Sequence, residues 1–282
     1  MFFAVAEGAV EKAGPHIELA AEQVFSLFGF PVTNSMILGI IGYALVGTLA
    51  YLLVRGVANG SRHKMVTLGQ WAFEGLVNMT EGVLQNKTLS RKVAPLAITI
   101  FFLVMFNNWI GILPGVGSIT SNGVPIFRGL AADLNFTFAL AFVTMVAVQF
   151  YAVKQFGLFG NIGRYIYNPL TNPIKAFEGI LEIVGEFSRF VALSMRLFGN
   201  VFGGEVLLTV IAFLAGWFAF LPLPLFMAFE LFIGALQAFV FYMLTIIFIS
   251  LAVSHGDGDH GKDTQPVETE EVDSTKLQPV NT

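Results

Sequence analysis

The 282-residue chain contains no cysteine and little charge. Because cysteine is absent, the chain can form neither a disulfide nor a thiolate metal site. Charged residues make up 12% of the sequence, against about 25% in a typical soluble domain, and hydrophobic residues make up 55%. A Gly-Lys-Ser/Thr phosphate-binding motif is also absent, so we expect no nucleotide site. These shortages argue against a soluble protein and indicate a polytopic integral membrane protein.

Five apolar segments are long enough to cross a bilayer, whose ~30 Å hydrocarbon core needs about 20 helical residues. They cover approximately 36–54, 94–113, 134–153, 173–215 and 225–253. The fourth would be roughly 65 Å long as a helix. It therefore either breaks near Gly199, Gly203 and Gly204 or lies strongly tilted, as half of a long tilted helical hairpin with the fifth segment. The sequence thus predicts an all-α integral membrane protein with five crossings.

Residues 67–86 have helical periodicity but a strongly polar face. The polar side chains recur at intervals of three or four residues: Gln70, Glu74, Asn78, Glu81 and Gln85. Apolar side chains occupy the opposite side. This pattern predicts an amphipathic helix lying in the plane of the membrane surface. A helix docked on another subunit is the alternative.

The charged residues suggest how the chain is organised and oriented. We expect an external N-terminal segment over 1–33, a membrane domain over 34–253, and a disordered acidic tail over 254–282. With five crossings, one face collects most of the basic residues: Arg55, Arg62, Lys64, Lys87, Arg91, Lys92, Lys154, Arg164, Lys175, Lys262 and Lys276. The other face has only Lys12 and Arg128. The positive-inside rule then places the N-terminus outside and the C-terminus in the cytoplasm.

Arg196 lies deep in the fourth crossing with no charged residue close beside it. Placing a cation at bilayer depth costs from about 3 to well over 10 kcal/mol, whereas a leucine at the same position has no such cost. Arg196 therefore indicates a function in moving or gating charge; a snorkelling or structural arginine is the alternative. A polar stripe shares its helix face: Glu182, Glu186, Arg189, Asn200 and Gly203. We interpret Arg189 as an ion-pair partner of Glu186 or Glu182.

Two carboxylates face each other in the predicted hairpin. A turn near residue 217 would place Glu205 opposite Glu230, and Arg196 opposite Gln237 at greater depth. Carboxylates that share a low-dielectric site repel each other and lose hydration, so they exchange protons closer to neutral pH. The pair suits a half-channel that opens to the outer face. Polar packing between helices is the alternative.

A second group of carboxylates lies toward the cytoplasmic end of the same helix: Glu178, Glu182 and Glu186. It suits a second half-channel, and Arg196 stands between the two. A guanidinium stays charged at physiological pH, so Arg196 cannot pass a proton on, but it can hold a carboxylate ionised. Neither half-channel crosses the membrane alone. A mobile proton carrier should therefore come from a partner subunit.

Several runs resemble subunit a of the F-type ATP synthase, bacterial type. They are Ser194-Met-Arg-Leu-Phe-Gly-Asn-Val-Phe-Gly-Gly-Glu205, Leu236-Gln-Ala-Phe-Val-Phe241, Asn107-Asn-Trp-Ile-Gly-Ile-Leu-Pro114, Ala132-Asp-Leu-Asn135 and Asn168-Pro-Leu-Thr-Asn-Pro173. The resemblance covers roughly residues 65–253. It implies that the 173–215 segment is a tilted helix wrapped along a ring of c subunits.

The resemblance also implies a role for individual residues. Arg196 matches the arginine that faces the carboxylate of the rotating c-ring. Glu205 and Glu230 match the outer half-channel pair, although many members place one carboxylate and one imidazole there. The remaining matches are two polar neighbours, a channel-lining asparagine and a carboxylate of the cytoplasmic path: Asn200, Gln237, Asn108 and Glu182.

The resemblance further implies a non-catalytic, proton-carrying stator in a bacterial plasma or inner membrane. Its expected partners are the c-ring, the peripheral-stalk b subunits and membrane lipid, with no cofactor, metal or nucleic acid. Two other classes are less well supported by the sequence. A secondary transporter should show internal repeats, which we do not find. A voltage sensor should carry several closely spaced arginines, whereas Arg189 and Arg196 are seven positions apart.

Overall fold

The computed structural model describes residues 20–27, 30–60, 63–117, 119–121, 124–163 and 173–254. Three of the predicted features lie wholly or largely outside these residues: the N-terminal segment up to residue 19, the motif at 168–172, and the acidic tail from residue 255. The described part of the chain is built mainly of α-helices: α2 (Asn34–Ala58), α3 (Lys64–Leu84), α4 (Lys87–Gly111), α5 (Leu134–Gly163), α6 (Pro173–Ala215) and α7 (Pro222–Ser254).

Short strands and turns connect these helices. A hairpin of β1 (Gln23–Leu27) and β2 (Phe30–Thr33) precedes α2. The α4–α5 connection contains β3 (Pro114–Gly117), the paired β4 (Thr120–Ser121) and β5 (Val124–Pro125), and a 3₁₀ turn, η1 (Leu130–Ala132). A second 3₁₀ segment, η2 (Gly216–Phe220), joins α6 to α7. The irregular backbone is therefore concentrated at the helix ends.

Five helical segments in the described residues are long and apolar enough to cross a membrane. They comprise α2, α4, most of α5, α7, and the stretch from α6 into η2. The all-α membrane fold predicted from the sequence is thus confirmed. The amphipathic α3 is not one of the five, and its placement along the membrane surface stays a prediction.

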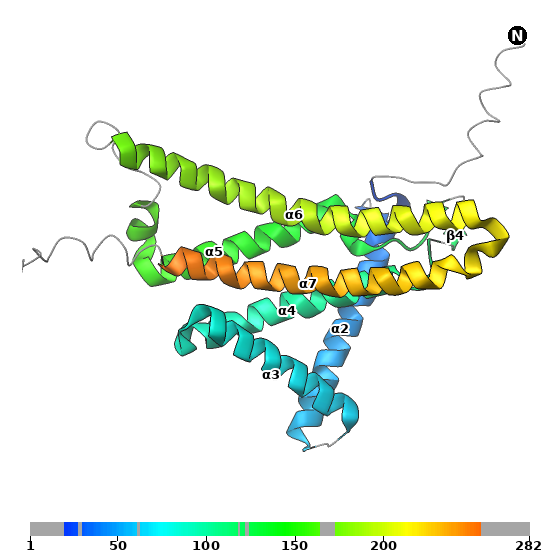
Figure 1. The fold of residues 1–282 in the computed structure, drawn as a ribbon, viewed down its shortest axis with the longest axis horizontal. Helices are drawn as coiled ribbons and strands as arrows, with labels where there is room; N and C mark the ends of the chain where they lie inside the picture. Colours follow the sequence, from blue (N-terminus) through cyan, green and yellow to red (C-terminus); the bar gives the residue numbers. More distant parts are fainter. Residues whose placement is uncertain are drawn as a thin grey trace, which may run out of the picture.

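Helix α6 is continuous from Pro173 to Ala215, so it does not break at Gly199, Gly203 or Gly204. It forms a long antiparallel hairpin with α7 that runs across most of the width of Figure 1. The turn between them contains Gly216, whose φ is 50°, a conformation that glycine adopts without steric cost. Of the two possibilities left open by its length, the structure excludes the broken helix.

Some helix ends differ from the limits of the apolar runs. Helix α4 begins at Lys87, well before the apolar residues, because the Asn86 side chain accepts the N–H groups of Thr88 and Leu89 at 3.0 and 3.2 Å. Helix α5 continues to Gly163 past a kink at Gly157. Helix α7 begins at Pro222, since proline is favoured in the first turn of a helix.

The core lies where α4, α5 and α7 meet α6 on one side and α3 on the other (Figure 1). Near α6 it contains Leu193, Leu197 and Phe241, which are almost fully buried. Near α3 it contains Tyr242, whose hydroxyl donates to Leu76 O at 2.6 Å and lies 2.7 Å from Thr80 Oγ1. This buried polar contact attaches the amphipathic helix to α7.

Candidate functional site

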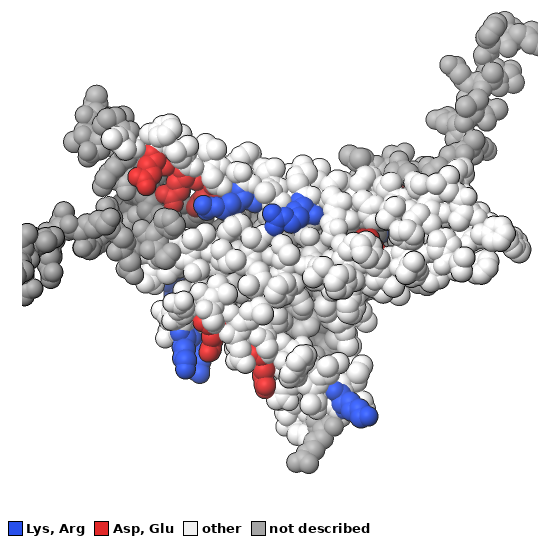
Figure 2. Space-filling model, viewed as in Figure 1, with Lys and Arg blue, Asp and Glu red and all other residues white. Residues whose placement is uncertain are grey.

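Arg196 lies on the outward side of α6. Its neighbours Leu193 and Leu197 are buried against α4, α5 and α7, which anchors the opposite side of the helix, whereas Arg196 itself is exposed. Among the described residues, its guanidinium has no hydrogen-bond or ion-pair partner. Figure 2 shows basic side chains on the surface of α6, next to acidic side chains near the start of this helix. The charge is thus presented to whatever covers α6.

At the deeper of the two predicted contacts, the hairpin pairs Gln237 with Asn200 and not with Arg196. Asn200 Nδ2 donates to Gln237 Oε1 at 3.5 Å, and Gln237 is only 6% exposed. The spacing argument placed Arg196 opposite Gln237, so the observed contact lies one helical turn further along α6. The turn itself includes the 3₁₀ segment η2, which the spacing argument did not take into account.

Glu230 is buried in the hairpin against the backbone of α6. It is 7% exposed, and a Cβ atom added to Gly204 would overlap its carboxyl group. On the other side, Gly234 lets α4 approach α7: Asn108 Nδ2 donates to Gly234 O at 3.4 Å. Asn108 is 3% exposed, and its Oδ1 has no hydrogen-bond partner within the described ranges. Two glycines therefore make room for two polar side chains.

These residues meet at a single cavity of about 360 Å³. Its polar lining comes from α4, α6 and α7: Asn108, Asn200, Glu205, Thr209 and Glu230. A water molecule needs only about 10–15 Å³ of such space, so the cavity is large enough for several. The structure thus brings together both carboxylates predicted to pair, with Asn108 and Asn200. Gln237 joins them through Asn200.

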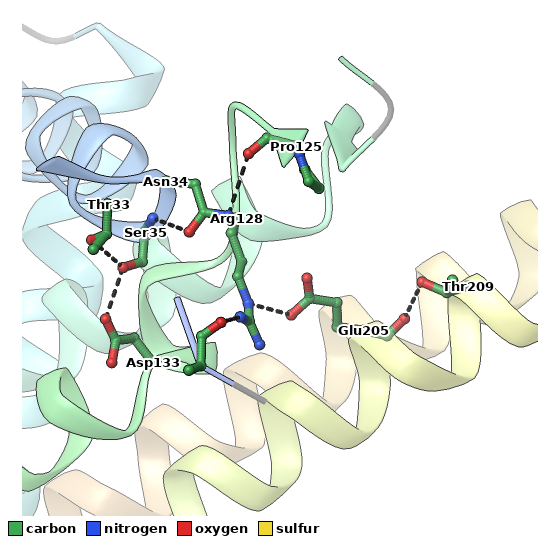
Figure 3. Close-up of polar contacts among 9 residues, drawn as sticks. Thr33, Asn34, Ser35, Pro125, Arg128, Asp133, Glu205 and Thr209 are labelled. Carbon is green, nitrogen blue, oxygen red and sulfur yellow. Dashed lines mark hydrogen bonds and ion pairs between the residues drawn. The ribbon is translucent and has the colours of Figure 1, made fainter. Parts of the chain in front are cut away.

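Arg128 is the residue of this site that the sequence analysis missed. It is 5% exposed, and its Nε lies 3.6 Å from Glu205 Oε2 (Figure 3). Its Nη1 donates to Ala20 O at 2.6 Å, and its guanidinium lies 5.9 Å from the centroid of the Phe202 ring. The carboxylate of Glu205 therefore faces an arginine as well as the shared cavity. The only hint in the sequence was the isolation of Arg128 in a loop otherwise without basic residues.

Hydrogen bonds hold the loop that carries Arg128. Asn34 Nδ2 donates to Pro125 O at 3.3 Å, and Ser35 Oγ donates to Asp133 Oδ2 at 2.8 Å (Figure 3). Asp133 Oδ1 also accepts the backbone N–H of Asn135 at 2.9 Å, which caps the start of α5. The beginning of α2 and the beginning of α5 thereby fix the loop on both sides of Arg128.

The other carboxylates lie toward the opposite end of α6, away from the cavity. Glu178 is exposed, while Glu182 and Glu186 are partly buried. Gln149 Nε2 of α5 donates to Glu186 Oε2 at 2.5 Å. The predicted ion pair between Arg189 and Glu182 or Glu186 is not found in the described part of the chain. The Arg189 guanidinium instead lies 5.7 Å from the centroid of the Phe248 ring, in a cation–π arrangement.

Comparisons with known proteins point to one family. The family described as ATP synthase A chain matches residues 35–250. The chain is 33% identical to ATP synthase subunit a of Campylobacter concisus, over 77% of this chain and 92% of the relative. It is 31% identical to that of Desulforamulus reducens, over 85% and 86%. It is 29% identical to that of Mycobacterium leprae, over 87% and 96%. The matched range contains Arg128, Arg196 and all the cavity residues.

Proposed function

Because the chain belongs to the ATP synthase A chain family, the proton-translocating subunit of the membrane sector, we propose that it carries protons through two offset half-channels. These would meet at Arg196, against a ring of c subunits. The chain is a multi-pass protein of the bacterial membrane; the outside position of its N-terminus and the cytoplasmic position of its C-terminus belong to the proposal. In this proposal the subunit itself has no nucleotide site and does not catalyse ATP synthesis; it only transfers protons.

The exposed guanidinium of Arg196 carries the proposal. An arginine in the middle of a membrane-crossing helix is costly in contact with lipid. Apolar side chains before and after it on α6 are also exposed, among them Phe187, Met195 and Leu207. A partner that presents a carboxylate to Arg196 would compensate the charge and cover the face. The c subunits fit this role because the missing carrier must itself move.

The two groups of carboxylates would supply the entry and exit paths. A proton enters from outside past Glu230 and Glu205 and neutralises a ring carboxylate, which can then face lipid. After the ring has turned, Arg196 attracts the ionised form, and the proton leaves past Glu186, Glu182 and Glu178. Each proton crossing 100 mV releases about 2.3 kcal/mol, so several are needed for each ATP.

Replacing Arg196 tests the proposal directly. Arg196→Ala should abolish ATP synthesis driven by an imposed proton gradient in membrane vesicles, while the subunit still inserts. Met195→Ala is the matched control, because Met195 is exposed on the same turn but apolar, and it should retain most activity. Sustained proton-driven synthesis in Arg196→Ala would contradict the mechanism, since the other cation of α6 between the two groups of carboxylates, Arg189, lies over the Phe248 ring and not at the hairpin cavity.

A further inference from the structure

Three polar side chains form a line from α5 to α6 near the beginning of α6. Asn161 Nδ2 donates to Gln149 Oε1 at 3.0 Å, and Gln149 Nε2 donates to Glu186 Oε2 at 2.5 Å. Asn161 is 6% exposed, and its Oδ1 is buried with no hydrogen-bond partner among the residues described. A buried amide oxygen of this kind is normally satisfied by protein or by water. The line therefore ends at an acceptor suited to a bound water molecule.

The kink at Gly157 makes the contact between Asn161 and Gln149 possible. In an uninterrupted helix, twelve residues would separate them by about 18 Å, beyond the reach of two short side chains. Gly157 has a φ of 75°, in the region that favours glycine, and redirects the last part of α5. Nothing lies within 4 Å of the position of a Cβ atom there. The glycine is thus required by backbone conformation and not by crowding.

The direction of these hydrogen bonds determines which end of the Gln149 amide meets Glu186. Because Asn161 donates to the amide oxygen of Gln149, the Gln149 NH₂ group is turned toward the carboxylate. The reverse orientation would place two oxygen acceptors against each other. Asn161 therefore positions Gln149, and Gln149 positions one carboxylate oxygen of Glu186.

We propose that Gln149 and Asn161 line the cytoplasmic half-channel and position Glu186 within it, an inference that rests on the proposed function. Neither amide side chain is itself protonated or deprotonated in this step. The proton released by a ring carboxylate binds a carboxylate oxygen of Glu186 and then passes to water on the cytoplasmic side, which leaves Glu186 ionised again. Helix α5 thereby contributes a polar wall to a path whose carboxylates all come from α6.

Because this chain has no cysteine, single thiols introduced into it can test this path in the complete ATP synthase, with the parent complex as the baseline. Gln149→Cys and Asn161→Cys are compared with Val146→Cys, which lies one turn from Gln149 on α5 and is 51% exposed on the outer surface of the chain. Silver ions are added to the cytoplasmic side of inverted vesicles, and ATP-driven proton pumping is measured. Silver reaches thiols through water, so it should inhibit the first two variants several-fold. Val146→Cys should respond no more than the parent enzyme.

Glu182→Cys distinguishes failure of this inference from failure of the proposed function. If silver inhibits Glu182→Cys from the cytoplasmic side but neither Gln149→Cys nor Asn161→Cys, the path exists without α5 and the inference is overturned. If none of the three variants responds, the cytoplasmic half-channel itself is contradicted. Inhibition of all three, with Val146→Cys unaffected, supports both.

A second measurement does not depend on thiols. Gln149→Leu should lower passive proton flux through the membrane sector about tenfold, the factor expected for losing one hydrogen bond to a charged group. Gln149→Asn keeps an amide and should retain more flux than Gln149→Leu. Flux at the parent level in both variants, with normal assembly of the complex, would overturn the inference. A merely structural Gln149 would alter assembly and not flux per assembled complex.

Discussion

At the scale of single residues, Arg128 and Arg196 do opposite things with the same functional group. Arg128 is 5% exposed and its guanidinium lies against Glu205, Ala20 O and Phe202, whereas Arg196 is exposed on α6. A guanidinium that is buried against a carboxylate acts on that carboxylate, while an exposed one is available to a partner. The residue type and its position in the sequence do not distinguish the two roles, but the contacts of the two arginines do.

The contact between Arg128 and Glu205 leads to a prediction about the outer carboxylate. Arg128→Gln removes the cation and leaves Glu205 Oε2, a buried atom, without its charged neighbour. The loss should destabilise the ionised form of Glu205, because a buried carboxylate oxygen no longer has a positive charge 3.6 Å away. We therefore expect proton-driven ATP synthesis in vesicles to fall several-fold, with normal amounts of the subunit in the membrane.

Arg128→Lys is the control for this prediction. It keeps a positive charge near Glu205, but a single ammonium group cannot reproduce all the contacts of the guanidinium. Its activity should therefore lie between those of the parent and Arg128→Gln. If both variants match the parent, Glu205 functions without this cation and the contact is only structural.

At the scale of helices, the sequence predicted the number, order and approximate limits of the membrane-crossing segments, because twenty apolar residues in a row have few other uses. It did not predict the kink of α5 at Gly157 or the exact register of the hairpin. Both depend on the backbone conformation of a few residues, at Gly157 and in η2, which apolar periodicity does not record. Helix α6 was left open as broken or continuous for the same reason.

Contacts between elements were predicted only where both partners lie in regular helices. The meeting of Glu205 and Glu230 at one cavity followed from antiparallel spacing, since each residue adds a known rise. Arg128 lies in an irregular loop whose path is fixed by hydrogen bonds from Asn34, Ser35 and Asp133. The path of such a loop follows no sequence periodicity, so only the structure reveals its approach to Glu205.

Packing between α6 and α7 makes Gly204 a sensitive position. Gly204→Ala adds a methyl group that would overlap the Glu230 carboxyl group, so this side chain must leave its place. Glycine in a helix otherwise costs roughly 0.5–1 kcal/mol relative to alanine, so the substitution would help the helix if the space were open. We expect proton-driven ATP synthesis to fall strongly.

Two comparison variants show whether the cause is the overlap. Gly75→Ala in α3 adds a methyl group where nothing lies within 4 Å, and it should leave the activity unchanged. The double variant Gly204→Ala with Glu230→Asp shortens the carboxylate side chain, and it should recover part of the activity lost in Gly204→Ala. Normal activity in Gly204→Ala alone would show that Glu230 moves freely and has no fixed place in the path.

At the scale of the whole molecule, one side of α6 has no packing partner within the described residues. The core joins α3, α4, α5 and α7 to one side of α6 through buried residues, while the described part of the chain leaves apolar side chains on the other side of α6 exposed. Lipid could cover an apolar face, but it could not compensate Arg196. The shape and the charge thus argue together for a protein partner along α6.

A photoreactive amino acid placed on α6 should identify that partner. Leu207 is 41% exposed and lies three helical turns from Arg196 on nearly the same side of α6, so a photoreactive residue there should cross-link to a c subunit in the assembled complex. Phe142 on α5 is 61% exposed and serves as the control, because α5 lies on a different surface of the chain. Capture of a c subunit from position 207 but not from 142, detected by mass spectrometry of the cross-linked band, is the expected result. Cross-linking to lipid alone at position 207, in a complex that still synthesises ATP, would mean that the ring does not cover α6 and that Arg196 meets no moving carboxylate.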